Sequence, residues 1–202
     1  DMRDSVRGVC PSLRGKRVCE LGAGAGLPGI AVAAHAGAAS VLLTDLFMHT
    51  VQNLEDNVAL NNVLLRDVET RVSARSLDWS DQEQWPKERF DVLIGSDLVY
   101  DTAMVPTLVT VVKGMLLGEG AAGGGDGDEG GGVFYYAAST TERDGMVEFV
   151  AAMQEAGFEL STRAVAPRAY HTNPLHEATQ TKCDLHFGGL KSKEFELFEW
   201  RI

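Results

Sequence analysis

Residues 18–45, VCELGAGAGLPGIAVAAHAGAASVLLTD, place a glycine-dense turn between an apolar run and an alanine-rich run. The apolar runs at 17–21 and 40–44 indicate buried strands, and the run at 27–36 is typical of a helix that ends near Gly37. Only glycine lets a backbone turn sharply with positive φ and approach a ligand closely. The turn at Gly22, Gly24 and Gly26 therefore predicts a binding site between a strand and a helix.

The same alternation continues along the chain. We expect further strands at 70–74, 90–95, 133–138, 158–165 and 195–201, and further helices at 48–61, 102–117 and 142–156. Such alternation predicts an α/β domain over residues 1–202, with a doubly wound, mostly parallel sheet covered by helices on both faces. Sheets of this kind bind ligands beyond the carboxyl ends of their strands, where the strand order reverses.

Two segments lie outside this pattern. Residues 118–132, GEGAAGGGDGDEGGG, have too few apolar side chains to offset the entropy of ordering, which predicts a flexible surface loop. His171, His176, Cys183 and His186 are four potential zinc ligands. Their order and gaps match no zinc pattern, so we predict no metal and leave their role open.

Charge and composition exclude several classes of partner. The net charge of −11 disfavours nucleic acid as the main partner and favours a basic protein surface. No apolar run reaches the roughly 18 residues that a membrane helix needs. The three cysteines form no CxxC pair, which favours a reducing compartment. We therefore expect a cytoplasmic protein, with the nucleus as a second location. We also expect a monomer.

The glycines alone leave the ligand undecided. Gly24, Gly26 and Gly29 have the G-x-G-x-x-G spacing of a dinucleotide site. The same pattern counted from Gly22 would need a glycine where the chain has Leu27. Glu20 separates the possibilities, because a carboxylate beside the turn repels a pyrophosphate and attracts a cationic amino acid end. The alternative is that Glu20 and Asp45 are ordinary solvated acids at the ends of strands.

At this point the sequence resembles the class I methyltransferases that use S-adenosylmethionine. Their first motif, E-x-G-x-G-x-G, matches Glu20, Gly22, Gly24 and Gly26. The resemblance implies that Asp45 accepts hydrogen bonds from the cofactor's ribose, a role that NAD sites share. It also implies that Asp78 and Trp79, in LDW, hold the adenine. Ser96, at the end of the strand at 90–95, completes the predicted cofactor-binding set.

FDVLIGSDLVYD, at 90–101, is similar to a narrower group, the protein-lysine methyltransferases of methyltransferase family 16. Their D-x-x-Y motif matches Asp97 and Tyr100, and the likeness runs over residues 17–117. The resemblance implies seven strands with the last antiparallel. It further implies a lysine-bearing protein substrate, such as a chaperone or translation component, with Asp97 and Tyr100 as the catalytic pair that holds the arriving ammonium.

The chain departs from the family in three places, one of which is the unusually long loop at 118–132. Family members have an upstream segment with a tryptophan, which residues 1–16 lack, so we expect that an N-terminal segment is missing. Residues 171–193 match nothing in the family. Four alternatives stay open: a histidine methyltransferase, a small-molecule methyltransferase, an interaction module with the same fold, and an NAD-dependent oxidoreductase.

Overall fold

The computed structural model describes residues 13–66, 68–118, 131–139, 144–166 and 194–202. Most of the predicted loop at 118–132 lies outside these residues, as do His171, His176, Cys183 and His186. No helix in the described part of the chain is long and apolar enough to cross a membrane.

Seven strands form one sheet in the order β3-β2-β1-β4-β5-β7-β6. The strands are β1 (Arg17–Leu21), β2 (Ser40–Asp45), β3 (Arg71–Ser76), β4 (Val92–Ser96), β5 (Val133–Ser139), β6 (Glu159–Val165) and β7 (Phe195–Arg201). β7 is antiparallel to both of its neighbours, β5 and β6, whereas the other pairs are parallel. This arrangement confirms the predicted mostly parallel sheet with an antiparallel last strand.

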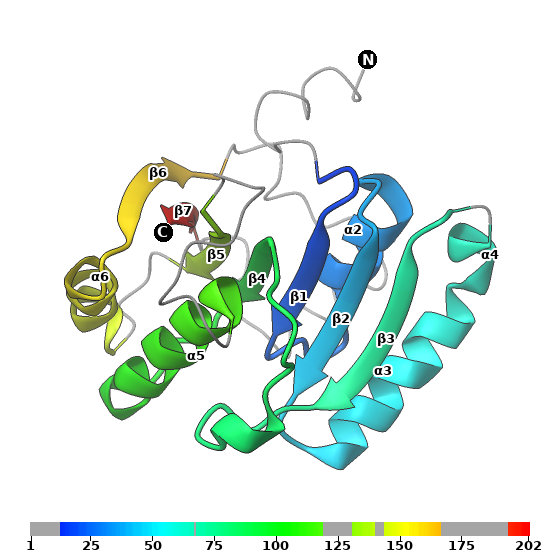
Figure 1. The fold of residues 1–202 in the computed structure, drawn as a ribbon, viewed down its shortest axis with the longest axis horizontal. Coiled ribbons are helices and arrows are strands. Elements are labelled where there is room, and N and C mark those ends of the chain that lie inside the picture. Colours follow the sequence, from blue (N-terminus) through cyan, green and yellow to red (C-terminus); the bar gives the residue numbers. More distant parts are fainter. Residues whose placement is uncertain (1–12, 67, 119–130, 140–143, 167–193) are drawn as a thin grey trace, which may run out of the picture.

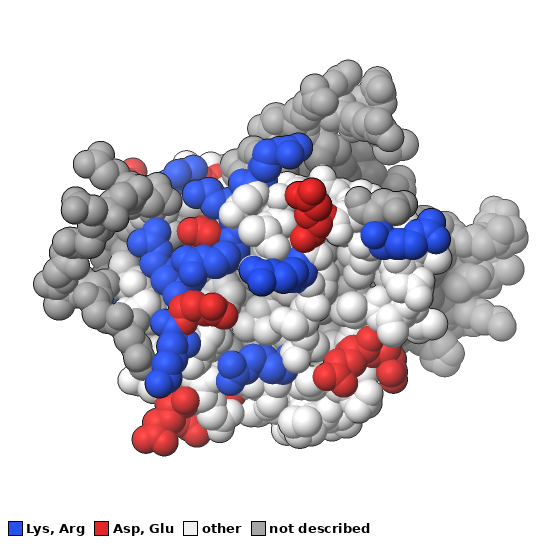
Figure 2. Space-filling view, turned by 45° about the vertical axis from the view of Figure 1, so that its right-hand side comes forward, with Lys and Arg blue, Asp and Glu red and all other residues white. Residues whose placement is uncertain are grey.

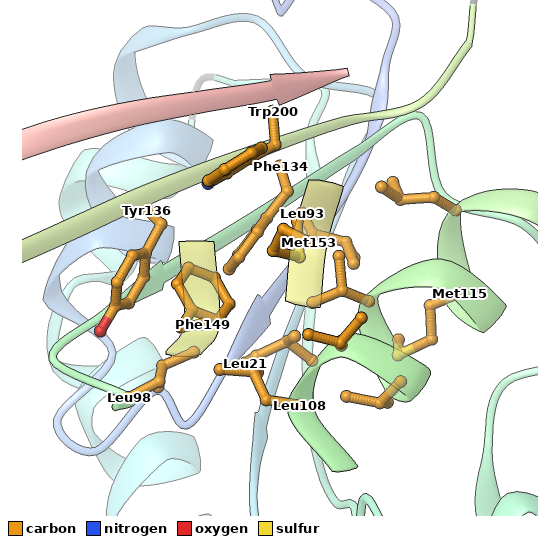
Figure 3. Packing of buried hydrophobic residues seen from close by; sticks show 14 of the residues in the cluster. Leu21, Leu93, Leu98, Leu108, Met115, Phe134, Tyr136, Phe149, Met153 and Trp200 are labelled. Atoms are coloured by element: carbon orange, nitrogen blue, oxygen red, sulfur yellow. The ribbon is translucent and has the colours of Figure 1, made fainter. Parts of the chain in front are cut away.

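Helices cover both faces of the sheet (Figure 1). They are α2 (Leu27–His35), α3 (Met48–Leu60), α4 (Asn62–Leu65), α5 (Val105–Leu117) and α6 (Met146–Glu155). The buried residues form two clusters, one beneath α2 and α3 and one beneath α5 and α6. The second cluster contains the large aromatic side chains Phe134, Tyr136, Phe149 and Trp200 (Figure 3).

Two helices begin differently from the prediction. The run at 102–117 starts as a 3-10 turn, Thr102–Met104, before α5 begins with a proline in its first turn. Within the described residues, the helix predicted at 142–156 begins at Met146, because Gly145 has a φ of 89° and cannot continue a right-handed helix. Positions 142 and 143 of that prediction lie outside the described residues.

One face of β3 has no helix over it in the described part of the chain. The link from β3 to β4 forms only a 3-10 turn, Gln82–Gln84, and the alternating residues Arg71, Ser73 and Arg75 are exposed. Figure 2 brings the β3 side of the molecule forward and shows Lys and Arg side chains gathered on part of it. An acidic chain thus carries a locally basic surface.

β1 and β4 lie side by side at the point where the strand order reverses. The chain runs outward from β1 through β2 to β3 and then returns to β4 on the other side of β1. The loops after these strands therefore separate at the carboxyl edge of the sheet, where ligands bind in folds of this type.

Candidate active site

The glycine turn after β1 needs glycine for two different reasons. Gly22, Gly24 and Gly26 all have positive φ, at 58°, 55° and 77°. A Cβ at position 22 would lie 2.7 Å from Leu98 Cδ2, so Gly22 allows the turn after β4 to pack closely. A Cβ at position 24 would meet no atom within 4 Å. Gly24 therefore leaves open space beside the backbone, as a ligand cradle requires.

Glu20 lies under this turn and is 1% exposed, so it is not the solvated acid that the sequence alone left open. The Gly29 N–H, in the first turn of α2, donates to Glu20 Oε2 at 2.9 Å. Burial raises the pKa of the Glu20 carboxyl to about 7, although the bond from Gly29 opposes the shift. A Cβ at position 29 would lie 2.5 Å from Glu20 Oε2, so Gly29 is needed for this contact.

Asp45 joins the end of β2 to the glycine turn. Its Oδ2 accepts from Gly24 N at 3.0 Å, and its Oδ1 accepts from Leu46 N at 2.9 Å. Each carboxylate oxygen has a second lone pair, so Asp45 keeps acceptor capacity for a ligand.

A cavity of about 430 Å³ opens at this edge of the sheet. Seven of the ten predicted site residues line it, namely Gly22, Asp45, Asp78, Trp79, Ser96, Asp97 and Tyr100. Glu20, Gly24 and Gly26 do not line it. A hollow of about 580 Å³ beside α4 contains none of the predicted site residues.

Asp78 and Trp79 follow β3, and Ser80 holds the Asp78 side chain in place. Asp78 Oδ1 accepts from the Ser80 amide at 2.8 Å and from the Ser80 hydroxyl at 2.6 Å. These two bonds lower the pKa of the Asp78 carboxyl. The Trp79 ring lies beside Gly22 and lines the cavity.

Asp97 and Tyr100 lie in the turn after β4. Asp97 has a φ of 55° and is the one non-glycine residue with positive φ in the described ranges. Its amide donates to Ala137 O at 2.9 Å, in β5. Asp101, not Asp97, caps the following 3-10 turn, because its Oδ1 accepts from Ala103 N. Tyr100 is 60% exposed and lines the cavity.

The sequence missed several residues of the cavity wall, including Leu46, Phe47, Met104 and Thr107. Leu46 and Phe47 directly follow Asp45 in the sequence. Their position next to a predicted cofactor-binding residue could have identified them. Met104 and Thr107 lie at the start of α5 and offered no motif.

The charge of the wall indicates what the cavity can hold. The carboxylates of Asp45, Asp78 and Asp97 line it, and none of the described lining residues is Lys, Arg or His. A pyrophosphate would meet three like charges without a cation to balance them, whereas a cationic ligand would be attracted. S-adenosylmethionine, with its sulfonium and ammonium groups, fits both this charge and the space beside Gly24.

Comparisons with known proteins show the family and the fold. A family model described as lysine methyltransferase matches residues 8–121, more than half of the chain. The chain therefore belongs to this lysine methyltransferase family. A crystal structure of an S-adenosylmethionine-dependent methyltransferase from Mesorhizobium loti has the same fold, with a TM-score of 0.57 and 17% identity over 98% of this chain and 96% of that one.

The names of two curated relatives state lysine as the residue that is methylated. The protein-lysine N-methyltransferase EFM3 of Chaetomium thermophilum is 29% identical over 52% of this chain and 32% of its own length. The protein N-lysine methyltransferase METTL21A of Danio rerio is 37% identical over 53% of this chain and 47% of its own length. The matched part thus spans less than half of each relative.

Proposed function

We propose that the protein transfers a methyl group from S-adenosylmethionine to a lysine side chain of a protein substrate. The observation that carries the proposal is the acidic cavity, whose wall includes Gly22 of the glycine turn together with Asp97 and Tyr100 at the carboxyl edge of the sheet. Membership of the lysine methyltransferase family and the names of the relatives support it.

The residues around the glycine turn would hold the cofactor, whose sulfonium supplies an electrophilic methyl group when bound. Glu20, buried beneath the turn, would favour the cationic amino acid end by charge, because a nearby cation lowers the carboxyl pKa and favours its ionised form. Asp45 would accept hydrogen bonds from the ribose hydroxyls through its remaining lone pairs. Asp78 and Trp79 would contact the adenine, with the indole as an apolar surface and Ser96 nearby in the wall.

Asp97 and Tyr100 would hold the acceptor. A lysine ammonium has an ordinary pKa of about 10.4 and must lose a proton before its nitrogen can attack. Asp97 would attract and orient the ammonium, and the Tyr100 ring would add a cation-π contact worth roughly 0.5 to 2 kcal/mol. Partial desolvation in the cavity lowers the pKa of the amine, so neither side chain has to be a strong base.

Labelled methyl transfer tests the proposal in variants of two aspartates, Asp97 and Asp101, that are only four residues apart. We expect the full chain, incubated with methyl-labelled S-adenosylmethionine and a cell lysate, to yield methyl-lysine in protein digests. Asp97→Asn should lower the rate by about 100-fold, because it removes the charge that positions the acceptor. Asp101→Asn is the matched control and should keep the rate, since asparagine also caps a helical turn.

Three outcomes would contradict the proposal. Label in methyl-histidine alone, or in small molecules alone, would assign a different acceptor. Equal losses in the Asp97 and Asp101 variants would remove Asp97 from the acceptor site. Binding of NADH without binding of S-adenosylhomocysteine would point to an oxidoreductase.

A further inference from the structure

The turn that carries Asp97 and Tyr100 is held by a buried hydroxyl from a neighbouring strand. Tyr136, in β5, is fully buried, and its Oη accepts from the Val99 N–H at 3.0 Å. Figure 3 shows the Tyr136 hydroxyl directed toward the segment with Leu98. Val99 lies between the two predicted catalytic residues, so the bond acts at the centre of their turn.

Aromatic neighbours on several sides fix the Tyr136 ring. The ring centroids of Phe149, Phe134 and Phe198 lie 5.3, 5.8 and 6.0 Å from that of Tyr136. These contacts involve the ring and not the hydroxyl, so a phenylalanine would keep the packing. The hydroxyl is therefore the part of the side chain that serves the turn.

The turn itself is in a conformation that needs support. Asp97 has a φ of 55°, a left-handed conformation that a non-glycine residue adopts at a cost in free energy. β5 provides three hydrogen bonds against this cost. Ala137 O accepts from the Asp97 amide, and Tyr136 Oη accepts from the Val99 amide. Asp97 Oδ1 accepts from the Ser139 amide at 3.4 Å, so Tyr136 is the side chain that supports the turn beyond Asp97 itself. Val99 is 1% exposed, so water cannot readily replace the tyrosine.

We propose that Tyr136 is a positioning residue for the acceptor side of the active site. Through the Val99 N–H it holds the Asp97–Tyr100 turn in the geometry that places the Asp97 carboxylate and the Tyr100 ring at the cavity. The expected effect of Tyr136 on the rate rests on the proposed methyl transfer. Its structural part, the dependence of the turn on the Tyr136 hydroxyl, can be measured without any substrate.

The test compares Tyr136→Phe with Tyr135→Phe in the full chain. Tyr135 is the adjacent residue of β5 and packs on the opposite face of the sheet, so its variant removes a tyrosine hydroxyl without touching the turn. In Tyr136→Phe we expect amide hydrogen exchange at Val99 to become at least about 10-fold faster. We also expect kcat for lysine methylation to fall by about 10-fold, while the Kd for S-adenosylhomocysteine stays within about threefold.

A second variant removes the doubt that Tyr136→Phe is misfolded. Replacing Tyr136 with 3-fluorotyrosine keeps the shape of the ring and weakens the hydroxyl as an acceptor, so it should change exchange and kcat in the same direction by a smaller factor. Thermal unfolding of each variant shows that it is folded.

Unchanged exchange at Val99 in Tyr136→Phe would overturn the inference. So would a kcat within twofold of the wild type, or a loss of cofactor affinity as large as the loss of kcat, which would indicate a general loosening of the core. A wild-type protein that methylates no lysine would contradict the proposed function alone, because the exchange measurement decides the role of the hydroxyl independently.

Discussion

The Glu20 carboxyl couples stability to pH, because its pKa is about 7 in the folded chain against an ordinary value of 4.5. Between these values the folded chain holds a proton that the unfolded chain has lost. The stability that this group contributes is therefore complete below pH 4.5 and is lost as the pH rises through 7. The full difference corresponds to about 3 kcal/mol.

Replacing Glu20 with glutamine tests this coupling. Glutamine has no ionisation and can still accept from Gly29 N. We expect Glu20→Gln to remove most of the decline in unfolding free energy between pH 5 and pH 8, measured by urea denaturation, and to weaken S-adenosylhomocysteine binding. The control Glu55→Gln, at an exposed position of α3, should keep the wild-type slope. Parallel pH profiles for wild type and Glu20→Gln would disprove the coupling.

The sequence located residues that belong to motifs and missed those that depend on the fold. Glu20, the glycines and Asp45 could be found because strand, turn and strand follow one another within 28 residues. Tyr136 could not, since it is 37 residues from Val99 and meets it only through the register that pairs Ser96 with Ala137. The ligand roles of the predicted site residues remain predictions.

At the scale of elements, α3 supports the glycine turn from outside the cavity. Asn57, on α3, donates from Nδ2 to Ala25 O at 2.9 Å. This bond ties the turn to a helix that follows β2, and it holds a carbonyl between Gly24 and Gly26. The turn is thus fixed from three sides, by β1, by Asp45 and by α3.

We expect Asn57→Ala to weaken S-adenosylhomocysteine binding by roughly 3- to 10-fold, the equivalent of one hydrogen bond of about 1 kcal/mol. Titration calorimetry measures this change. Asn53→Ala, one turn earlier on the exposed side of α3, changes helix propensity in the same way and should leave binding unaltered. Equal affinities in the two variants would mean that the turn does not need the support of α3.

Elements with a clear apolar pattern were predicted closely, and those without one were not. β1 and β7 have the predicted bounds, because each strand contains buried apolar residues. β3 was expected at 70–74 and runs over Arg71–Ser76. Its exposed face is polar and no described helix covers it, so the strand lacks the apolar run that marks a buried strand.

At the scale of the molecule, the position of β7 lay beyond the reach of local sequence patterns. It inserts between β5 and β6, two strands that precede it in the chain. Only the resemblance to a family implied an antiparallel last strand. The net charge was a similarly coarse guide, because Arg71 and Arg75 are both exposed on β3 of a chain with a net charge of −11.

The outer position of β3 in the sheet also has a consequence for solubility. An edge strand offers unpaired backbone groups on which a strand of another molecule can assemble, and charged side chains oppose such assembly. Arg71 and Arg75 are exposed on this edge strand. We expect the double variant Arg71→Val, Arg75→Val to form soluble oligomers or precipitate as its concentration rises, measured by size-exclusion chromatography with light scattering.

A matched variant, Glu55→Val, Asp56→Val, adds the same two apolar side chains to the exposed surface of α3. It should remain monodisperse, because the backbone groups of a helix are already paired. Aggregation of both variants to the same extent would mean that apolar surface alone drives the association. If the β3 variant alone aggregates, the two arginines oppose intermolecular strand addition. Replacing them should then be avoided when substitutions are chosen for crystallisation or expression.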